Sequence, residues 1–240
     1  MADSIQFASK LPGKFLVIDG PDGAGKGMQI AMLAEAFGRA GVPCVTTHDP
    51  GDTAVGDRIR QILLHSAQPL DTATEVLLFM ASRAQLVAEK IRPALADGKA
   101  VICDRFISAT CAYQGATGAD LATIIQLGRF AVGDTWPDLT IVLDLPVEEG
   151  LRRIGVAKRG KSNGTGKSAA ATAEQSMLFK DAVADTMEQR SLDFHRRVRK
   201  IFRELPASGI YPRRVELVNA GGSPLEVHER IIETLARALG

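Results

Sequence analysis

A short strand, a glycine-rich loop and a helix follow one another in residues 14–41, and this succession constrains the fold more than any other feature. The apolar run "KFLVID" (14–19) predicts a buried strand. The loop "GPDGAGKG" (20–27) comes next, and the helical spacing of Leu33 and Phe37 follows it. A loop placed between a strand and a helix surrounds an anion with backbone N–H groups and the positive helix end. The segment therefore predicts a phosphate-binding site.

The loop departs from the full pattern of phosphate-binding loops, G-x-x-x-x-G-K-[ST]. Gly20, Gly25 and Lys26 fit it, but Gly27 stands at the position of the magnesium-binding hydroxyl. The stretch "GVAKRGKS" (155–162) matches the full pattern, yet a predicted helix precedes it and low-complexity sequence follows it. We therefore interpret the second match as accidental and the first loop as the phosphate site. The alternative for the first loop is a glycine-rich turn that binds nothing.

Strands alternate with helices along the rest of the chain. Further strands are predicted at 42–48, 99–104, 137–146 and 213–220. Helices are predicted at 25–41, 54–65, 72–98, 118–133, 147–154, about 174–204 and 223–239, with Pro93 kinking or interrupting the third. This order predicts an α/β fold of P-loop NTPase type, one domain over residues 1–240, with helices on both faces of a five-stranded parallel sheet. Ligands in such sheets bind at the carboxyl ends of the strands, after residues 19, 48, 104 and 145.

Composition narrows the class of function. Lys and Arg number 29 against 28 for Asp and Glu, a balance that argues against a general nucleic-acid binder. The three cysteines fit no metal-binding spacing and indicate reduced thiols. The N-terminus has no signal-peptide core, and no run of about 18 apolar residues occurs. We expect a cytoplasmic protein with neither nucleic acid nor a membrane as its partner.

Polar residues follow two of the predicted strands. Asp104 and Arg105 emerge after the strand 99–104, where a carboxylate is suited to Mg²⁺ and a guanidinium to a phosphate. The alternative is a structural ion pair. The stretch "DPGDT" (49–53) follows the strand 42–48 and is expected either to shape a substrate pocket or to act as a plain turn.

Two helices each place two candidate base-contacting residues one turn apart. Phe79 and Arg83 share one face of the helix 72–98, which suits stacking on a base and contact with its oxygens. Core packing is the alternative for the aromatic ring. Thr110 and Gln114 likewise share one face and are candidate readers of a base edge; a plain surface helix is the alternative.

Residues 155–180 differ in kind from their surroundings. Up to residue 175 they are rich in Gly, Ser, Ala, Thr and Lys, which is typical of a flexible surface loop. A basic loop beside a phosphate site is also a candidate for a mobile lid that closes over the transferred group. Its basic residues are Lys158, Arg159, Lys161 and Lys167, and Arg152 and Arg153 lie at the end of the predicted helix before it.

Six stretches in order resemble the successive motifs of the thymidylate kinases. They are "FLVIDGPDGAGKGMQ", "DPGDTAVGDRIRQILL", "LLFMASRAQLVAEKIRPAL", "VICDRFISATCAYQG", "PDLTIVLDLPVEEGLRRI" and "DTMEQRSLDFHRRVR". The resemblance covers about residues 14–200 apart from the lid region. It implies transfer of the ATP γ-phosphoryl group to dTMP to give dTDP, with Mg²⁺, in a homodimer.

The resemblance also implies roles for single residues. The ATP phosphates would be held by Gly20, Pro21, Asp22, Gly23, Ala24, Gly25, Lys26, Gly27 and Met28. The contacts to dTMP would come from Asp22, Pro50, Arg60, Phe79, Arg83, Arg105, Thr110, Tyr113 and Gln114. Phe79 would stack on thymine, Arg83, Thr110 and Gln114 would face its polar edge, and Arg105 would grip the phosphate. Tyr113 would pack near the deoxyribose, and Pro50 and Arg60 would line the pocket. Asp22 and Asp104 would lie at the metal.

Catalysis in such a site would depend on positioning and charge neutralisation. Lys26, Arg105, Asp22 with the metal, and Arg153 or Arg159 would surround the transferring group. The family usually has Ser-Thr where Gly27 and Met28 stand, and commonly Asp where Ser82 stands. Two alternatives stay open: a kinase for another nucleoside monophosphate, and a nucleotide-binding protein without catalysis.

Overall fold

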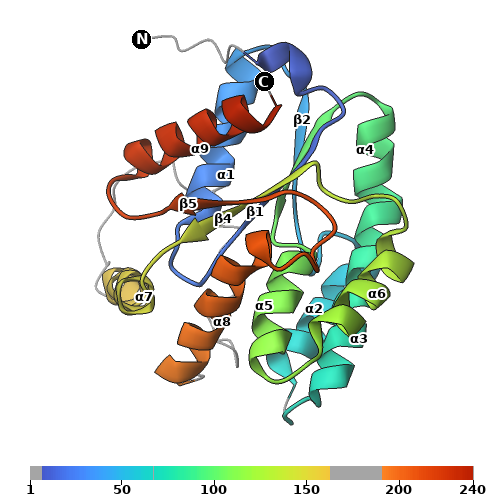
Figure 1. The fold of residues 1–240 in the computed structure, drawn as a ribbon, viewed down its shortest axis with the longest axis vertical. Helices are drawn as coiled ribbons and strands as arrows, with labels where there is room; N and C mark the ends of the chain where they lie inside the picture. Colours follow the sequence, from blue (N-terminus) through green and yellow to red (C-terminus); the bar gives the residue numbers. More distant parts are fainter. Residues whose placement is uncertain (1–6, 67, 163–190, 240) are drawn as a thin grey trace.

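A computed structural model of the chain describes residues 7–66, 68–162 and 191–239. These residues form a five-stranded, all-parallel sheet in the order β2-β3-β1-β4-β5, as Figure 1 shows. The strands are β1 (Phe15–Asp19), β2 (Cys44–His48), β3 (Ala100–Asp104), β4 (Leu139–Asp144) and β5 (Val215–Asn219). Each lies inside a range predicted from the sequence, so the predicted fold class is confirmed.

The central strand β1 divides the interior into two cores. Phe15 and Val17 point into one, while Leu16 and Ile18 point into the other, because successive side chains of a strand alternate between faces. Asp104 at the end of β3 pairs with Ile18 of β1 and with His48 of β2. The register therefore places the loops that follow β1, β2 and β3 at one edge of the sheet.

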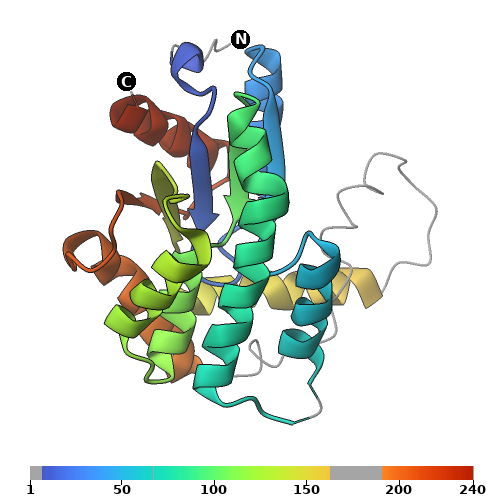
Figure 2. The same ribbon diagram turned by 90° about the vertical axis from the view of Figure 1, so that its right-hand side faces the viewer.

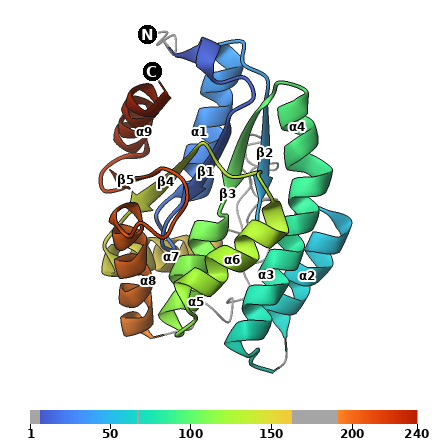
Figure 3. The ribbon, with the colours of Figure 1, turned by 45° about the vertical axis from the view of Figure 1, so that its right-hand side comes forward.

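Helices cover both faces of the sheet (Figures 1 and 3). One face carries α1 (Lys26–Arg39) and α9 (Pro224–Leu239), which pack on each other. The other face carries α3 (Thr72–Leu86), α4 (Arg92–Ala96), α5 (Ile107–Ala116), α6 (Leu121–Val132) and α8 (Leu192–Glu204). The helix α2 (Ala54–His65) packs on α3. Short 3₁₀ turns occupy Ala8–Lys10 and Leu205–Ala207.

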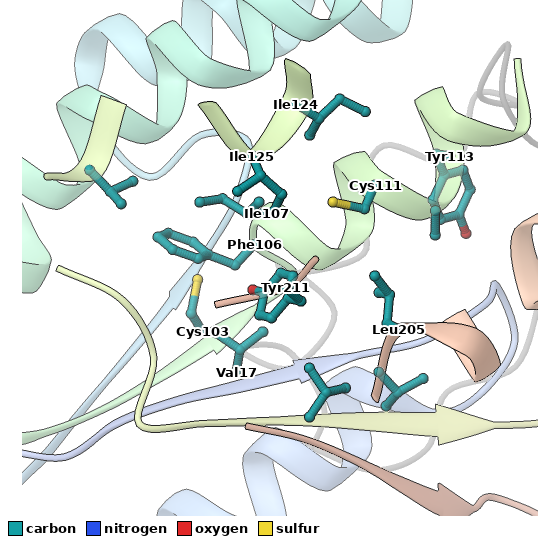
Figure 4. Close-up of a cluster of buried hydrophobic side chains, with 14 of the residues drawn as sticks. Val17, Cys103, Phe106, Ile107, Cys111, Tyr113, Ile124, Ile125, Leu205 and Tyr211 are labelled. Atoms are coloured by element: carbon teal, nitrogen blue, oxygen red, sulfur yellow. The ribbon is translucent and has the colours of Figure 1, made fainter. Parts of the chain in front are cut away.

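The core beneath α5 fixes that helix on the sheet (Figure 4). Phe106 and Ile107, where the helix begins, belong to the same buried cluster as Val17 of β1 and Cys103 of β3, and the close-up shows Phe106 beside Cys103. The rings of Phe15 and Phe106 meet edge to face, with 5.1 Å between their centroids. This packing fixes the rotation of α5 about its axis, and the rotation in turn determines which way its polar side chains face.

One helix prediction is refined by the structure and another needs correction. The predicted helix 72–98 is divided into α3, a π-helical turn over Val87–Ile91, and α4, in which Pro93 occupies the first turn. An interruption caused by Pro93 was predicted, since proline cannot donate an intrahelical hydrogen bond, and the π-helical turn lies directly before α4 and its proline. The helix predicted at 147–154 continues as α7 (Val147–Ser162), so the start of the segment interpreted as a loop is helical.

The helical conformation of residues 155–162 excludes a second strand–loop–helix phosphate site there. The remainder of the predicted lid, 163–180, and the predicted helical part 174–190 lie outside the described residues, and so does the side chain of Arg159. Within the described ranges, no helix combines the length and the apolar character that crossing a membrane requires.

Candidate active site

The loop after β1 adopts a shape that only glycine permits at two positions. Gly20 has φ 135°, and a Cβ atom there would lie 2.6 Å from the carbonyl oxygen of Leu143 in β4. Gly23 has φ 78°, and its Cβ would lie 2.2 Å from the carbonyl oxygen of Gly150 in α7. The loop is thus pressed between β4 and α7, and Figure 2 shows α7 running just beyond the carboxyl ends of the strands.

Lys26, the first residue of α1, folds back over this loop. Its Nζ donates hydrogen bonds to the carbonyl oxygens of Gly20 (3.1 Å) and Pro21 (3.2 Å), and the side chain is buried. Gly25, in the left-handed conformation at φ 91°, caps the helix. A helix N-terminus and a buried ammonium group therefore meet in one loop, as phosphate binding requires.

Arg105 joins the end of β3 to the same loop. It has the left-handed φ of 65°, and its backbone N–H donates to the carbonyl oxygen of Ile18 (3.1 Å). Its Nη2 donates to Asp22 Oδ1 at 2.5 Å, and its guanidinium lies 4.9 Å from the centre of the Tyr113 ring. The structure thus brings Asp22 of the phosphate loop together with Arg105 and Tyr113, which both belong to the motif "VICDRFISATCAYQG".

Burial and neighbouring charges have competing effects on the pKa values of Asp22 and Lys26. Burial raises the pKa of the Asp22 carboxyl, but the positive charges of Arg105 and Lys26 outweigh it and hold that pKa below its usual value. Burial, together with the charge of Arg105, lowers the pKa of Lys26 despite the nearby carboxylates. Asp22 is therefore held in its ionised form, which is the form that binds a cation.

A third carboxylate, Asp19, was missed by the sequence analysis. It is fully buried at the end of β1 and accepts hydrogen bonds from the Gly20 N–H (2.8 Å) and from Ser108 Oγ (2.6 Å). Burial raises its pKa above the usual value, against the opposing effect of Arg105. Its position directly before the loop was the available signal, but an aspartate in an apolar run was interpreted only as the end of a strand.

Asp104 offers an oxygen without a protein partner. Its Oδ1 is buried and accepts no hydrogen bond, although buried polar atoms are normally satisfied. Asp104 pairs with Ile18 of β1, so it lies at the edge of the sheet where the phosphate loop begins. No group of three or more potential metal ligands occurs among the described residues.

The predicted base-contacting residues form two rows on α3 and α5. Arg83 is fully buried: its Nε donates to Asp49 Oδ2 (2.6 Å), and its Nη2 donates to Thr110 Oγ1 (3.0 Å). Gln114 donates from Nε2 to Glu75 Oε2 at 2.9 Å. The sequence analysis did not identify Glu75, although it stands one turn before Phe79 on the same face of α3.

The loop after β2 is tied to α2 and α3. The Asp49–Pro50 peptide bond is cis, and Arg60 Nη1 donates to the carbonyl oxygen of Pro50 at 2.9 Å. The Gly51 N–H donates to Ser82 Oγ at 3.0 Å. The stretch 49–53 is therefore held in a defined conformation beside Arg83, as a substrate-shaping loop requires.

A cavity of about 430 Å³ lies on the other side of the phosphate loop. Gly25, Met28 and Gln29 line it together with Arg153 of α7 and the loop after β5. The Arg153 guanidinium donates to Ala220 O (3.3 Å) and to Glu149 Oε1 (2.7 Å). Gln29 and the β5–α9 loop were missed; the glycine-rich run "NAGGSP" after the last strand was the signal.

A phosphate loop, two cations and paired carboxylates at the edge of a parallel sheet define a P-loop phosphotransferase. The family model for thymidylate kinase matches residues 18–183. The chain belongs to the thymidylate kinase family, and its activity is that of a thymidylate kinase.

Individual relatives agree with this assignment. A thymidylate kinase of Synechococcus sp. (strain JA-3-3Ab) is 42% identical, covering 90% of this chain and 92% of its own. One of Thermomicrobium roseum is 39% identical over 94% of this chain and 95% of its own. The crystal structure of thymidylate kinase from Ehrlichia chaffeensis superposes with a TM-score of 0.66 at 28% identity, covering 94% of this chain and 99% of that one.

Proposed function

We propose that this chain transfers the γ-phosphoryl group of ATP to dTMP with Mg²⁺, using the residues around the Arg105–Asp22 pair. The observation that carries the proposal is that Arg105, Asp22 and Lys26 lie together between the phosphate loop and the end of β3. Two cations beside the meeting point of two phosphates reduce the repulsion between them, which is the main requirement of phosphoryl transfer.

The donor side of the proposed site is the loop 20–28 and the cavity beside it. Backbone N–H groups of the loop and the Lys26 ammonium would hold the phosphates of ATP. The 430 Å³ cavity would take the nucleoside part, with Arg153 along its wall. Because Arg153 is tied to Ala220 and Glu149, we assign it to the binding of ATP and retain Arg159 as a candidate for the lid arginine.

The acceptor side is the surface between α3, α5 and the loop after β2. Arg105 would bind the phosphate of dTMP in exchange for part of its contact with Asp22. Phe79 would stack on the base, and Tyr113 would pack near the sugar. The base edge would meet Thr110 and Gln114, with Arg83 behind Thr110. Pro50 and Arg60 would close the remaining side.

Asp22 and Asp104 fit a magnesium ion. Mg²⁺ prefers oxygen ligands, and nucleotide enzymes commonly hold it by one or two carboxylates plus phosphates and waters. The unpartnered Asp104 Oδ1 and the ionised Asp22 carboxylate supply such oxygens. The ion would neutralise charge on the phosphates. Gly27 supplies no hydroxyl, so water would complete the coordination.

The decisive experiment couples ADP release to a panel of nucleoside monophosphates. We expect turnover with ATP and Mg²⁺, with dTMP and dUMP as the best acceptors and little turnover of dCMP, dGMP or AMP. A different best acceptor would show a kinase for another monophosphate. Binding of dTMP without turnover at any magnesium concentration would show a nucleotide-binding protein, the alternative that Gly27 suggests.

The proposal extends to the assembly. Phe130 on α6 is 93% exposed and Leu77 on α3 is 56% exposed, and the two helices pack on each other. Large exposed apolar side chains on two helices that pack on each other are typical of an interaction surface. We infer a homodimer through α3 and α6. We likewise infer that the chain acts as one kinase domain in the cytoplasm, where it would meet free nucleotides.

A further inference from the structure

Gln114 and Thr110, the two residues of α5 assigned to the base edge, each contact an ionisable residue of α3. Glu75, Phe79 and Arg83 follow one another at four-residue spacing, so they lie on one face of α3. Glu75 contacts Gln114 and Arg83 contacts Thr110, at the two ends of one turn of α5. Phe79 stands on α3 between the residue that contacts Gln114 and the residue that contacts Thr110.

The contact with Glu75 determines which way the Gln114 amide faces. The amide NH₂ of Gln114 donates and the carboxyl oxygen of Glu75 accepts, so the NH₂ group is the end of the amide that points to Glu75. Gln114 Nε2 donates to Glu75 Oε2 at 2.9 Å, and both side chains are buried. Gln114 Oε1 is left buried without a partner. A buried amide oxygen in this state is a strong acceptor for an N–H group of a ligand.

The contact with Arg83 leaves Thr110 with a free donor, whereas the contact with Glu75 leaves Gln114 with a free acceptor. A guanidinium only donates, so the Thr110 hydroxyl oxygen accepts from Arg83 Nη2 at 3.0 Å and its proton is directed elsewhere. The pair therefore offers one acceptor, on Gln114, and one donor, on Thr110. Thymine and uracil present the matching N3–H donor and O4 acceptor, whereas cytosine presents an N3 acceptor and a 4-amino donor.

We propose that Glu75 is a positioning residue for base selection: it orients the Gln114 amide so that Oε1 accepts the N3–H of the acceptor base. The inference rests on the proposed dTMP site and adds a residue that does not itself touch the base. If Glu75 were replaced by glutamine, the Gln114 amide could turn over and present its NH₂ to the base. The turned amide would favour cytosine and disfavour thymine.

The test measures kcat/KM for dTMP, dUMP and dCMP with wild type, Glu75→Gln and Glu75→Asp. Glutamine keeps the size of the side chain, and aspartate keeps the charge but is too short for the contact. We expect the preference for dTMP over dCMP to fall about tenfold or more in both variants, because a mispaired buried polar group discriminates strongly. The ratio of dTMP to dUMP should not change, since both bases carry N3–H.

Two controls separate a specific effect from a loss of folding. Glu89→Gln, an exposed exchange in the π-helical turn after α3, should leave all three values unchanged. In a Gln114→Leu background, Glu75→Gln should no longer alter the preference for dTMP over dCMP. Calorimetric affinities for the three monophosphates without ATP should follow the same pattern, and thermal unfolding reports the integrity of each variant.

The outcomes are distinguishable. An unchanged preference for dTMP over dCMP in both Glu75 variants, with intact folding, would overturn the role of Glu75 and leave the proposed function standing. A wild type that accepts dCMP as readily as dTMP would overturn the proposed function itself. A lower preference that persists equally in the Gln114→Leu background would show that Glu75 acts by another route, which also contradicts the proposal.

Discussion

Asp19 illustrates how a single buried carboxylate lowers stability beside a catalytic loop. Because burial raises its pKa in the folded state, folded protein binds more protons than unfolded protein above the ordinary pKa of 3.8. The contribution of Asp19 to stability therefore falls as the pH rises from 3.8 through the raised pKa of the folded state. We expect Asp19→Asn to raise the melting temperature at pH 7.5, with a smaller gain near pH 5.

Calorimetric melting of Asp19→Asn and wild type at the two pH values checks this expectation. Asparagine keeps an acceptor for the Gly20 N–H, and Ser108 can donate or accept, so both hydrogen bonds survive the exchange. A variant less stable than wild type at pH 7.5 would show that the attraction of Arg105 outweighs burial.

Arg83 is fully buried and Arg105 is only partly buried, and substitutions of the two arginines should have different consequences. Arg105→Ala removes charge at the phosphates, and we expect a loss in kcat/KM of about 3–4 kcal/mol, several hundredfold, with a modest change in stability. Arg83→Ala leaves the fully buried Asp49 carboxylate without its cation, which typically costs about 3–5 kcal/mol of unfolding free energy. The exposed exchange Arg39→Ala serves as the control.

Steady-state kinetics and urea unfolding of the three variants decide between these roles. Equal losses of kcat/KM for Arg105→Ala and Arg83→Ala, without a larger loss of stability for the latter, would contradict the assignment.

Gly27 bears on the magnesium requirement. It lacks the hydroxyl that would supply one oxygen to the proposed magnesium ion, but it keeps its backbone N–H. We expect Gly27→Ser to lower the magnesium concentration for half-maximal rate, because a fixed hydroxyl replaces a water. Lys26→Ala should nearly abolish turnover at any magnesium concentration, since water carries no positive charge. A magnesium titration that leaves Gly27→Ser identical to wild type would mean that this position does not contact the metal shell.

At the scale of elements, the phosphate loop and α7 approach each other without any side chain between them. A Cβ atom on Gly150 would lie 2.4 Å from the carbonyl oxygen of Asp22. We expect Gly150→Ala to displace the loop, raise KM for ATP and cost about 1–3 kcal/mol of stability. Gly155→Ala, in the same helix, meets no atom within 4 Å and should be neutral or slightly stabilising. Equal kinetics for the two variants would refute a close fit between loop and α7.

At the scale of the whole molecule, the exposed Phe130 should control assembly. Burying a phenylalanine side chain contributes about 1.5–3 kcal/mol, and a charge at its place opposes association. We expect Phe130→Asp to sediment as a monomer where wild type sediments as a dimer. Leu225→Asp, an exposed position on α9, should keep the dimer. A wild-type monomer, or a dimeric Phe130→Asp, would exclude the α3–α6 interface.

The sequence by itself determined the local parts of this protein. Short apolar runs ended by turn residues predicted β1, β3 and β4, since burial on both faces imposes that pattern. The edge strands β2 and β5 were also predicted, although they are only partly buried and carry polar residues. The loop at 20–27 was predicted because glycine and lysine at that spacing meet a backbone requirement that is local. Six motifs in order were enough to identify the family.

Only the tertiary structure decided which polar groups meet. Asp19 and Ser108 are 89 residues apart, Arg83 and Asp49 are 34 apart, and Gln114 and Glu75 are 39 apart. A periodic pattern of apolar residues predicts which side of a helix or strand is buried, but not which residues of other elements that side contacts. The pairing depends on strand order, register and helix packing, and these arise from the burial of the whole core. The orientation of Gln114, and with it the proposed choice of base, is therefore determined by the tertiary structure and not by the local sequence.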